Sequence, residues 1–301
     1  MSLVIKYSFD KIMPFLKSLI KSGYENCDIV FFINQISQIT INYLISFGII
    51  LCEIQGKLNN RNNIYKYRWK FYGDYLIKNK EKYDIVLSVD IRDTIFQNDF
   101  FKLYENYEPF IAFSYENATL KKLIDKEWII NTFGYKIFKK IEDQRIINAG
   151  TIWGTSNEFC EFSNLLFKKL LKYFSAIDQA VVNYLIYYEK IMNHCVQIKS
   201  DENGPVLTLG LTKRENIILD DENNILNNKG HIAPIVHQYD RHPDLKKIMK
   251  NKFCPELTNI NNIIIYFIMV ESFTLIILIK ILNSLNRIKK EKRNYLNRIK
   301  K

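Results

Sequence analysis

Two carboxylates stand at the end of a predicted buried strand. The segment Asp84–Val89 is apolar and β-branched, as is typical of a strand that is covered on both faces. Asp90 and Asp93 follow it, with Arg92 between them. Open α/β sheets bind their ligands at the carboxyl ends of strands, and carboxylates suit Mg²⁺ or Mn²⁺ beside a diphosphate. We therefore predict a metal and diphosphate site here. The simpler alternatives are that Asp90 caps a following helix and that Asp93 pairs with Arg92.

The chain around this strand alternates predicted strands and helices. Strands are expected at Leu3–Tyr7, Asp28–Ile33 and Ile49–Ile54, and two intervening helices should end at Gly23 and Gly48. A long helix at 65–79 then leads into the acidic strand. This order predicts an α/β fold with a mostly parallel, twisted sheet flanked by helices.

Three later segments carry polar residues at marked positions. A strand at Arg145–Gly154 is interrupted by Asn148-Ala149-Gly150, and the glycine suggests a close approach of the backbone to another group. A helix at Asp178–Tyr188 opens with Asp178-Gln179, and a strand at His231–Tyr239 contains His237. We expect one domain over residues 1–257 and a separate apolar and basic segment over 258–301.

The C-terminal segment carries most of the net charge of +11. Lys280–Lys301 holds nine Lys or Arg and one acid, which leaves only +3 for the preceding 279 residues. The apolar run Ile263–Leu282 precedes it and contains Glu271. This run predicts an amphipathic helix on an anionic membrane surface, a membrane span, or a helix packed on protein. No nucleic-acid partner is expected, because the basic stretch has no reader motif.

The cysteines and the N-terminus bear on location. Five cysteines without a CxxC pair indicate reduced thiols, and no signal-peptide pattern is present at the N-terminus. We expect a cytoplasmic protein, peripheral or C-terminally anchored at the inner face of the membrane.

Three sequence blocks resemble one enzyme class. VDIRDTIFQNDFF (89–101) is similar to the acidic signature of GT-A-fold nucleotide-diphospho-sugar glycosyltransferases, in a bacterial branch reading D-x-R-D-x-x-F-Q-x-D-P-F. INAGTIWG (147–154) with DQAVVNYL (178–185) resembles blocks of the family-8-like transferases, and IVHQYDRHPDL (235–245) resembles the C-terminal block of the same branch. The chain departs from the usual D-x-D pair, because Arg92 occupies the second acidic position, and Phe100 replaces the proline of the branch.

The resemblance implies a role for each matching residue, with Mn²⁺ or Mg²⁺ as cofactor. The implied metal ligands are Asp90, Asp93 and His237. The implied donor-binding residues are Tyr7, Arg68, Asp90, Arg92, Asn148, Ala149, Gly150 and Arg241, and Asp178 and Gln179 are the implied catalytic pair. The partners would be a nucleotide-diphosphate sugar and a glycan or lipid-linked acceptor.

Structural explanations remain open for several of these residues. Arg68 could lie on a solvated helix face, Asp178 could cap its helix, and Arg241 could belong to a surface turn. Tyr7 and His237 could be core residues. The alternative functions are a degenerate GT-A protein that binds without catalysis and a metal-dependent phosphohydrolase that uses the two aspartates.

Overall fold

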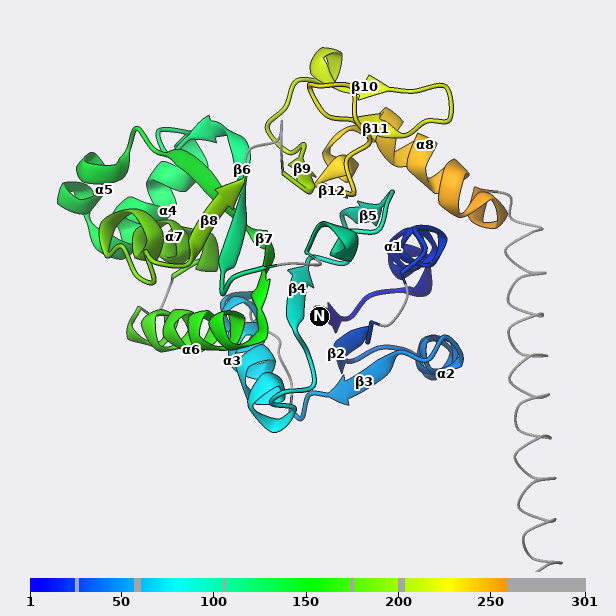
Figure 1. Ribbon diagram of the computed structural model, residues 1–301, viewed down its shortest axis with the longest axis horizontal. Helices are drawn as coiled ribbons and strands as arrows, with labels where there is room; N and C mark the ends of the chain where they lie inside the picture. Colours follow the sequence, from blue (N-terminus) through cyan, green and yellow to red (C-terminus); the bar gives the residue numbers. More distant parts are fainter. Residues whose placement is uncertain (25–26, 57–60, 105–106, 174–175, 200–203, 259–301) are drawn as a thin grey trace, which may run out of the picture.

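The structure is a computed structural model that describes residues 1–258 except 25–26, 57–60, 105–106, 174–175 and 200–203 (Figure 1). Its strands are β1 Ser2–Ile5, β2 Val30–Asn34, β3 Ile50–Glu53, β4 Ile85–Val89, β5 Thr94–Phe96, β6 Ile111–Thr119, β7 Arg145–Thr155, β8 Val196–Lys199, β9 Val206–Thr208, β10 Ile218–Leu219, β11 Ile225–Leu226 and β12 Ile235–His237. Its α-helices are α1 Phe9–Lys21, α2 Gln38–Ser46, α3 Arg61–Lys78, α4 Leu123–Phe133, α5 Tyr135–Ile141, α6 Ser156–Lys172, α7 Asp178–Asn183 and α8 Pro243–Phe253.

Parallel strands form the N-terminal half of the central sheet. The strands β1, β2 and β3 are consecutive and parallel. The Val89 amide donates to the Met1 carbonyl at 3.2 Å, and the Ser2 hydroxyl donates to the Val89 carbonyl at 2.8 Å, so β4 lies beside β1. The second half has the order β4-β7-β6-β8, in which β7 runs antiparallel to both of its neighbours. The predicted α/β class, with parallel-rich sheets flanked by helices, is confirmed.

Helices cover both faces of this sheet (Figure 1). Alternate residues of β2 point to opposite faces, as the two-residue period of a strand requires. Phe31 and Ile33 join a core with α1 and α8, whereas Val30 and Phe32 join a second core with α3 and α6. The predicted helix ends at Gly23 and Gly48 are confirmed, and both glycines have positive φ angles.

A bulge in β7 shapes the middle of the sheet. The pairing of β6 with β7 shifts between Phe113↔Ile152 and Tyr115↔Ile147. Four residues of β7, Asn148–Thr151, therefore stand opposite the single residue Ser114 of β6. A bulge re-aims side chains at the edge of a site. The predicted interruption at Asn148-Ala149-Gly150 is this bulge.

A small sheet of order β5-β12-β9 closes the carboxyl end of β4. Its register places His237 of β12 opposite Thr94 of β5, and Thr94 follows Asp93 directly. The amide of Gln238 also donates to the carbonyl of Asp93 at 2.7 Å. Residues more than 140 positions apart in the sequence are thus held side by side by backbone pairing.

Some predicted elements differ from the structure. The helix expected over Asp178–Tyr188 is confirmed, but it changes type: α7 ends at Asn183 and a π-helical turn continues over Tyr184–Tyr188. Among the described residues, no helix is both long enough and apolar enough to cross a membrane. The predicted apolar and basic segment lies outside the described residues, apart from its first position, residue 258.

Candidate functional site

One cavity collects all twelve of the predicted site residues. It has a volume of about 450 Å³ and opens at the carboxyl ends of β1 and β4. The predicted residues on its wall are Tyr7, Arg68, Asp90, Arg92, Asp93, Asn148, Ala149, Gly150, Asp178, Gln179, His237 and Arg241. A second cavity of about 530 Å³, beside the amino end of β4, contains none of them. The sequence blocks thus meet in space as the resemblance requires.

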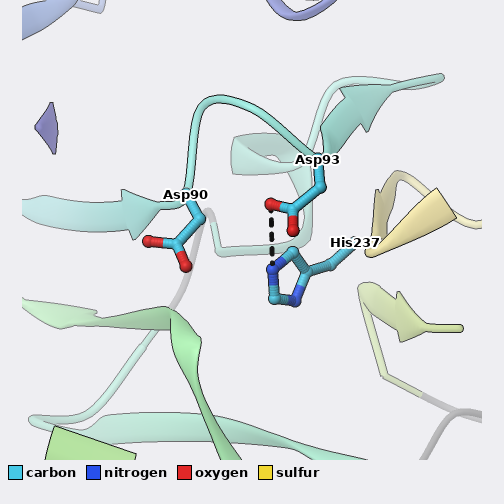
Figure 2. Close-up of side chains that lie close together, drawn as sticks. All are labelled: Asp90, Asp93 and His237. Atoms are coloured by element: carbon cyan, nitrogen blue, oxygen red, sulfur yellow. Dashed lines mark ion pairs between the residues drawn. The ribbon is translucent and has the colours of Figure 1, made fainter. Parts of the chain in front are cut away.

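Three side chains form a candidate metal site, here called the metal corner: Asp90, Asp93 and His237. One ligand atom from each lies within 4.8 Å of the others. Figure 2 shows Asp90 and Asp93 on either side of the turn after β4, with His237 reaching them from β12. Asp93 and His237 are buried, whereas the side chain of Asp90 is 45% exposed. The corner therefore has two fixed ligands and one that faces the cavity.

The buried atoms of the metal corner fit a cation. His237 Nε2 lies 3.5 Å from Asp93 Oδ1, which is too long for a good hydrogen bond. Asp93 Oδ1 and both ring nitrogens of His237 have no hydrogen-bond partner in the described part of the chain. Buried polar atoms are rarely left in this state, and carboxylate and imidazole are ligands that Mn²⁺ accepts.

Electrostatics favour the charged form of Asp93. Burial alone would raise the pKa of this carboxyl, but His237 and the Arg92 guanidinium outweigh burial and hold the pKa well below its usual value. Arg92 Nη2 donates to Asp93 Oδ2 at 2.8 Å, which confirms the predicted pairing. Burial lowers the pKa of His237, and Asp93 reverses this effect and raises it.

Gly150 leaves the space that the metal corner occupies. A Cβ atom at this position would lie 2.5 Å from His237 Cε1 and 2.8 Å from Asp90 Oδ2. The predicted close approach of the backbone at Gly150 is confirmed, and the group that it approaches is this ligand cluster.

Arg68 of α3 connects Asp90 of the metal corner with Asp178 of α7. Its Nη1 donates to Asp90 Oδ1 at 2.8 Å, and its Nη2 lies 2.5 Å from Asp178 Oδ2. Nη2 also donates to the Ala149 carbonyl at 3.0 Å. Burial lowers the pKa of Arg68, but Asp178 and Asp90 overcome this effect and raise it. A solvated helix face is therefore the wrong explanation for this buried arginine.

The side chain of Asp178 is also fully engaged. It is buried, and its Oδ2 accepts from Trp69 Nε1 at 3.2 Å as well as from Arg68. Burial raises the pKa of Asp178, against the opposing charge of Arg68. The N-cap of α7 is Ile177, so a capping role for Asp178 is wrong. The helix cap predicted for Asp90 is also wrong, because the next element after Asp90 is β5.

Another part of the cavity wall is lined by two amides that rest on two buried acids. This amide wall consists of Asn148, Gln179, Glu116 and Asp125. Asn148 Nδ2 donates to Glu116 Oε1 at 2.6 Å, and Gln179 Nε2 donates to Glu116 Oε1 at 3.1 Å and to Asp125 Oδ1 at 2.8 Å. The two acids belong to no predicted site, because the segment 116–144 has no motif and no clear periodicity.

The mouth of the cavity is basic and aromatic. The side chains of Arg92 and Arg241 are 41% and 48% exposed, and Arg241 Nη2 lies 3.8 Å from Asp93 Oδ2. Tyr7 is half-buried, and burial together with the charge of Asp90 raises its pKa to about 12. Trp128 of α4, which had no predicted role, also lines the cavity. The cavity thus combines an acidic floor, two exposed cations and flat aromatic surfaces.

Comparisons with known proteins add little to this picture. No protein-family profile and no curated protein sequence matches the chain. Among solved structures, an active-site mutant of LgtC aligns with 79% of this chain and 86% of its own, at 13% sequence identity and a TM-score of 0.48.

Proposed function

We propose that this protein is a GT-A-fold glycosyltransferase that moves a sugar from a nucleotide-diphosphate donor to a hydroxyl of a glycan acceptor. The observation that carries the proposal is the meeting of four separate sequence segments around one cavity. The acidic block and the HQYDRHP block supply the metal corner, and the INAG and DQ blocks supply another part of the same wall. In this proposal the metal corner would hold the charged leaving group, and the INAG and DQ blocks would hold the hydroxyl-rich sugar.

The metal corner and the exposed arginines would hold the diphosphate. Asp90, Asp93 and His237 would bind Mn²⁺ or Mg²⁺, which would offset the negative charge of the departing nucleoside diphosphate. Arg92 and Arg241 are exposed enough to contact phosphate oxygens directly. Arg68 is already paired with Asp90 and Asp178. We therefore assign it to positioning these two acids instead of binding the diphosphate.

The part of the cavity wall formed by β7 and α7 would hold the sugar and support bond cleavage. Asn148, Ala149 and Gly150 lie along the bulge of β7 where a sugar ring would rest, and Gln179 would face the anomeric carbon. Asp178, the residue before Gln179, adds a buried negative charge. This charge would favour the positive charge that develops as the glycosidic bond breaks. Tyr7 offers a flat surface for the nucleotide base.

The first test is binding. Mn²⁺ with UDP or GDP, and with their sugars, should raise the melting temperature of the protein, because a ligand of the native state stabilises it by mass action. Asp93→Asn should abolish the Mn²⁺-dependent part of the shift and lower donor hydrolysis by roughly a hundredfold or more. Asp74→Asn, in an exposed pair with Lys70, is the matched control.

Three outcomes would contradict the proposal. Unchanged Mn²⁺ dependence in Asp93→Asn would remove the metal assignment. Faster release of phosphate from simple esters than hydrolysis of nucleotide sugars would identify a phosphohydrolase instead. Donor binding without any hydrolysis or transfer would indicate a binding protein on the same fold.

A further inference from the structure

The amide nitrogen of Gln179 has no hydrogen left for a ligand. Nε2 carries two hydrogens, and these are donated to Glu116 Oε1 at 3.1 Å and to Asp125 Oδ1 at 2.8 Å. Among the described residues, the oxygen end accepts one long bond, from the amide of Ala149 at 3.4 Å. Because Gln179 lines the cavity, its oxygen is the polar atom that it can offer to a ligand.

Asn148 is oriented in the same way by the same acid. Its Nδ2 donates to Glu116 Oε1 at 2.6 Å, and its Oδ1 accepts from the amide of Gly150 at 2.7 Å. The two ends of an amide are told apart by their partners, and both partners agree for Asn148. A single carboxylate oxygen of Glu116, Oε1, therefore accepts a hydrogen bond from the nitrogen of each amide.

We propose that Glu116 and Asp125 are positioning residues that hold the Gln179 carboxamide with its oxygen toward the cavity. In the reversed orientation the amide oxygen would face two carboxylates, which is repulsive and leaves buried acceptors without donors. The inference rests on the proposed function, in which this oxygen faces the positive charge that develops on the sugar. It extends the site to two acids that carry no motif.

The placement of these acids is costly to the fold, as expected for residues kept for a function. Both side chains are buried in the interior that β6, α4 and α7 share. No salt bridge joins either acid to a cation in the described part of the chain, and the side chains that donate hydrogen bonds to them there are the amides of Asn148 and Gln179. Burial and the nearby charge of Glu116 raise the pKa of Asp125 to about 6, although the bond from Gln179 opposes that rise.

A thermodynamic cycle tests the orientation without any substrate. Gln179→Glu places a third carboxylate against the two acids and should lower the melting temperature by about 5 °C or more. In the Glu116→Gln/Asp125→Asn background the new amides can donate to that carboxylate, so the same substitution should cost far less. Equal losses in the two backgrounds would overturn the proposal. If the double background fails to fold, the cycle is run with Asp125→Asn alone.

Kinetics provide the second arm. Glu116→Gln/Asp125→Asn should lower kcat for donor hydrolysis by about tenfold to a hundredfold, because orientation is lost, while the KM for the donor changes less than about threefold. A purely structural role would leave kcat intact in the folded fraction, and that result would overturn the proposal. Asp143→Asn, whose exposed side chain pairs with Lys121, is the control. Absence of hydrolysis in the wild type would refute the proposed function, and the thermal cycle would still decide the orientation.

Discussion

The two sides of the cavity differ in how their buried polar atoms are satisfied. In the metal corner, Asp93 Oδ1 and both ring nitrogens of His237 have no hydrogen-bond partner in the part of the chain that the structure describes. In the amide wall, both ends of the Asn148 amide and the nitrogen of Gln179 are held by protein groups, and the Gln179 oxygen accepts one long bond at 3.4 Å. Buried polar groups need partners, so the protein satisfies most polar atoms of the amide wall but leaves several of the metal corner without one. Substitutions in the two regions should therefore have different effects.

The largest effect is expected from Arg68, which ties the two sides together. Arg68→Met leaves Asp178 buried without its cation, and breaking a buried pair in this way costs about 3–5 kcal/mol. The melting temperature should fall by about 10 °C, as measured by calorimetry or circular dichroism.

A compensating variant sharpens this test. Arg68→Met/Asp178→Leu removes both charges and should regain much of the lost stability, without regaining activity. If the double variant is no more stable than Arg68→Met, the cost does not come from the unpaired charge of Asp178. Arg68 would then stabilise the fold by packing, for example through its stacking on Trp69 at 4.7 Å.

A methyl group can close the metal corner while leaving the amide wall intact. Gly150→Ala should weaken Mn²⁺ binding by about tenfold to a hundredfold, because its Cβ would meet His237 and Asp90. Isothermal titration with Mn²⁺ measures the loss. Gly73→Ala is the matched control, since its Cβ would meet only the flexible Asn164 amide, far from the cavity. Equal Mn²⁺ affinity in both variants would remove Gly150 from the corner.

The amide wall should leave a signature in the pH dependence of stability. The pKa of Asp125 is about 6 in the folded protein and near 3.8 when exposed, so the folded state binds more protons between these values. Stability from this group is therefore full below about pH 4 and is lost as the pH rises through 6. The wild type should lose up to about 3 kcal/mol relative to Asp125→Asn across this window. Urea unfolding at pH 4, 5, 6 and 7 measures the difference, and a constant difference would contradict the raised pKa.

The sequence predicted the metal corner well, because its signal is local or carried by a motif. The acids follow an apolar strand, and His237 lies in a recognisable block. The structure shows that these residues line one cavity. Their roles stay predictions. The sequence predicts that Arg68 belongs to the site, but it does not predict the ion pairs of Arg68 with two acids. These pairs depend on how α3 packs against β4 and α7.

Glu116 and Asp125 could not be predicted, for a related physical reason. Their importance comes from the shared partner Gln179, which is more than 50 positions away from each of them in the sequence. Buried acids that accept hydrogen bonds from amides follow no recognisable spacing in the sequence. Candidate metal ligands at strand ends do follow one. The bulge of β7 was visible through Gly150, but not the number of residues that it inserts.

The smallest expected effect separates the two exposed arginines at the mouth of the cavity. Arg92 donates to Asp93 at 2.8 Å, whereas the ion pairs of Arg241 with Asp93 and Asp240 are longer, at 3.8 Å and 3.9 Å. Arg92→Gln should weaken nucleotide binding by about tenfold, because it would remove the proposed phosphate contact and also loosen Asp93, a proposed metal ligand. Arg241→Gln should cost only about threefold, and this loss should vanish at high salt, since an exposed charge is screened. Binding measured at low and high salt distinguishes them. If Arg241→Gln matches Arg92→Gln at high salt, then Arg241 belongs to the metal corner and contacts the ligand in a desolvated place.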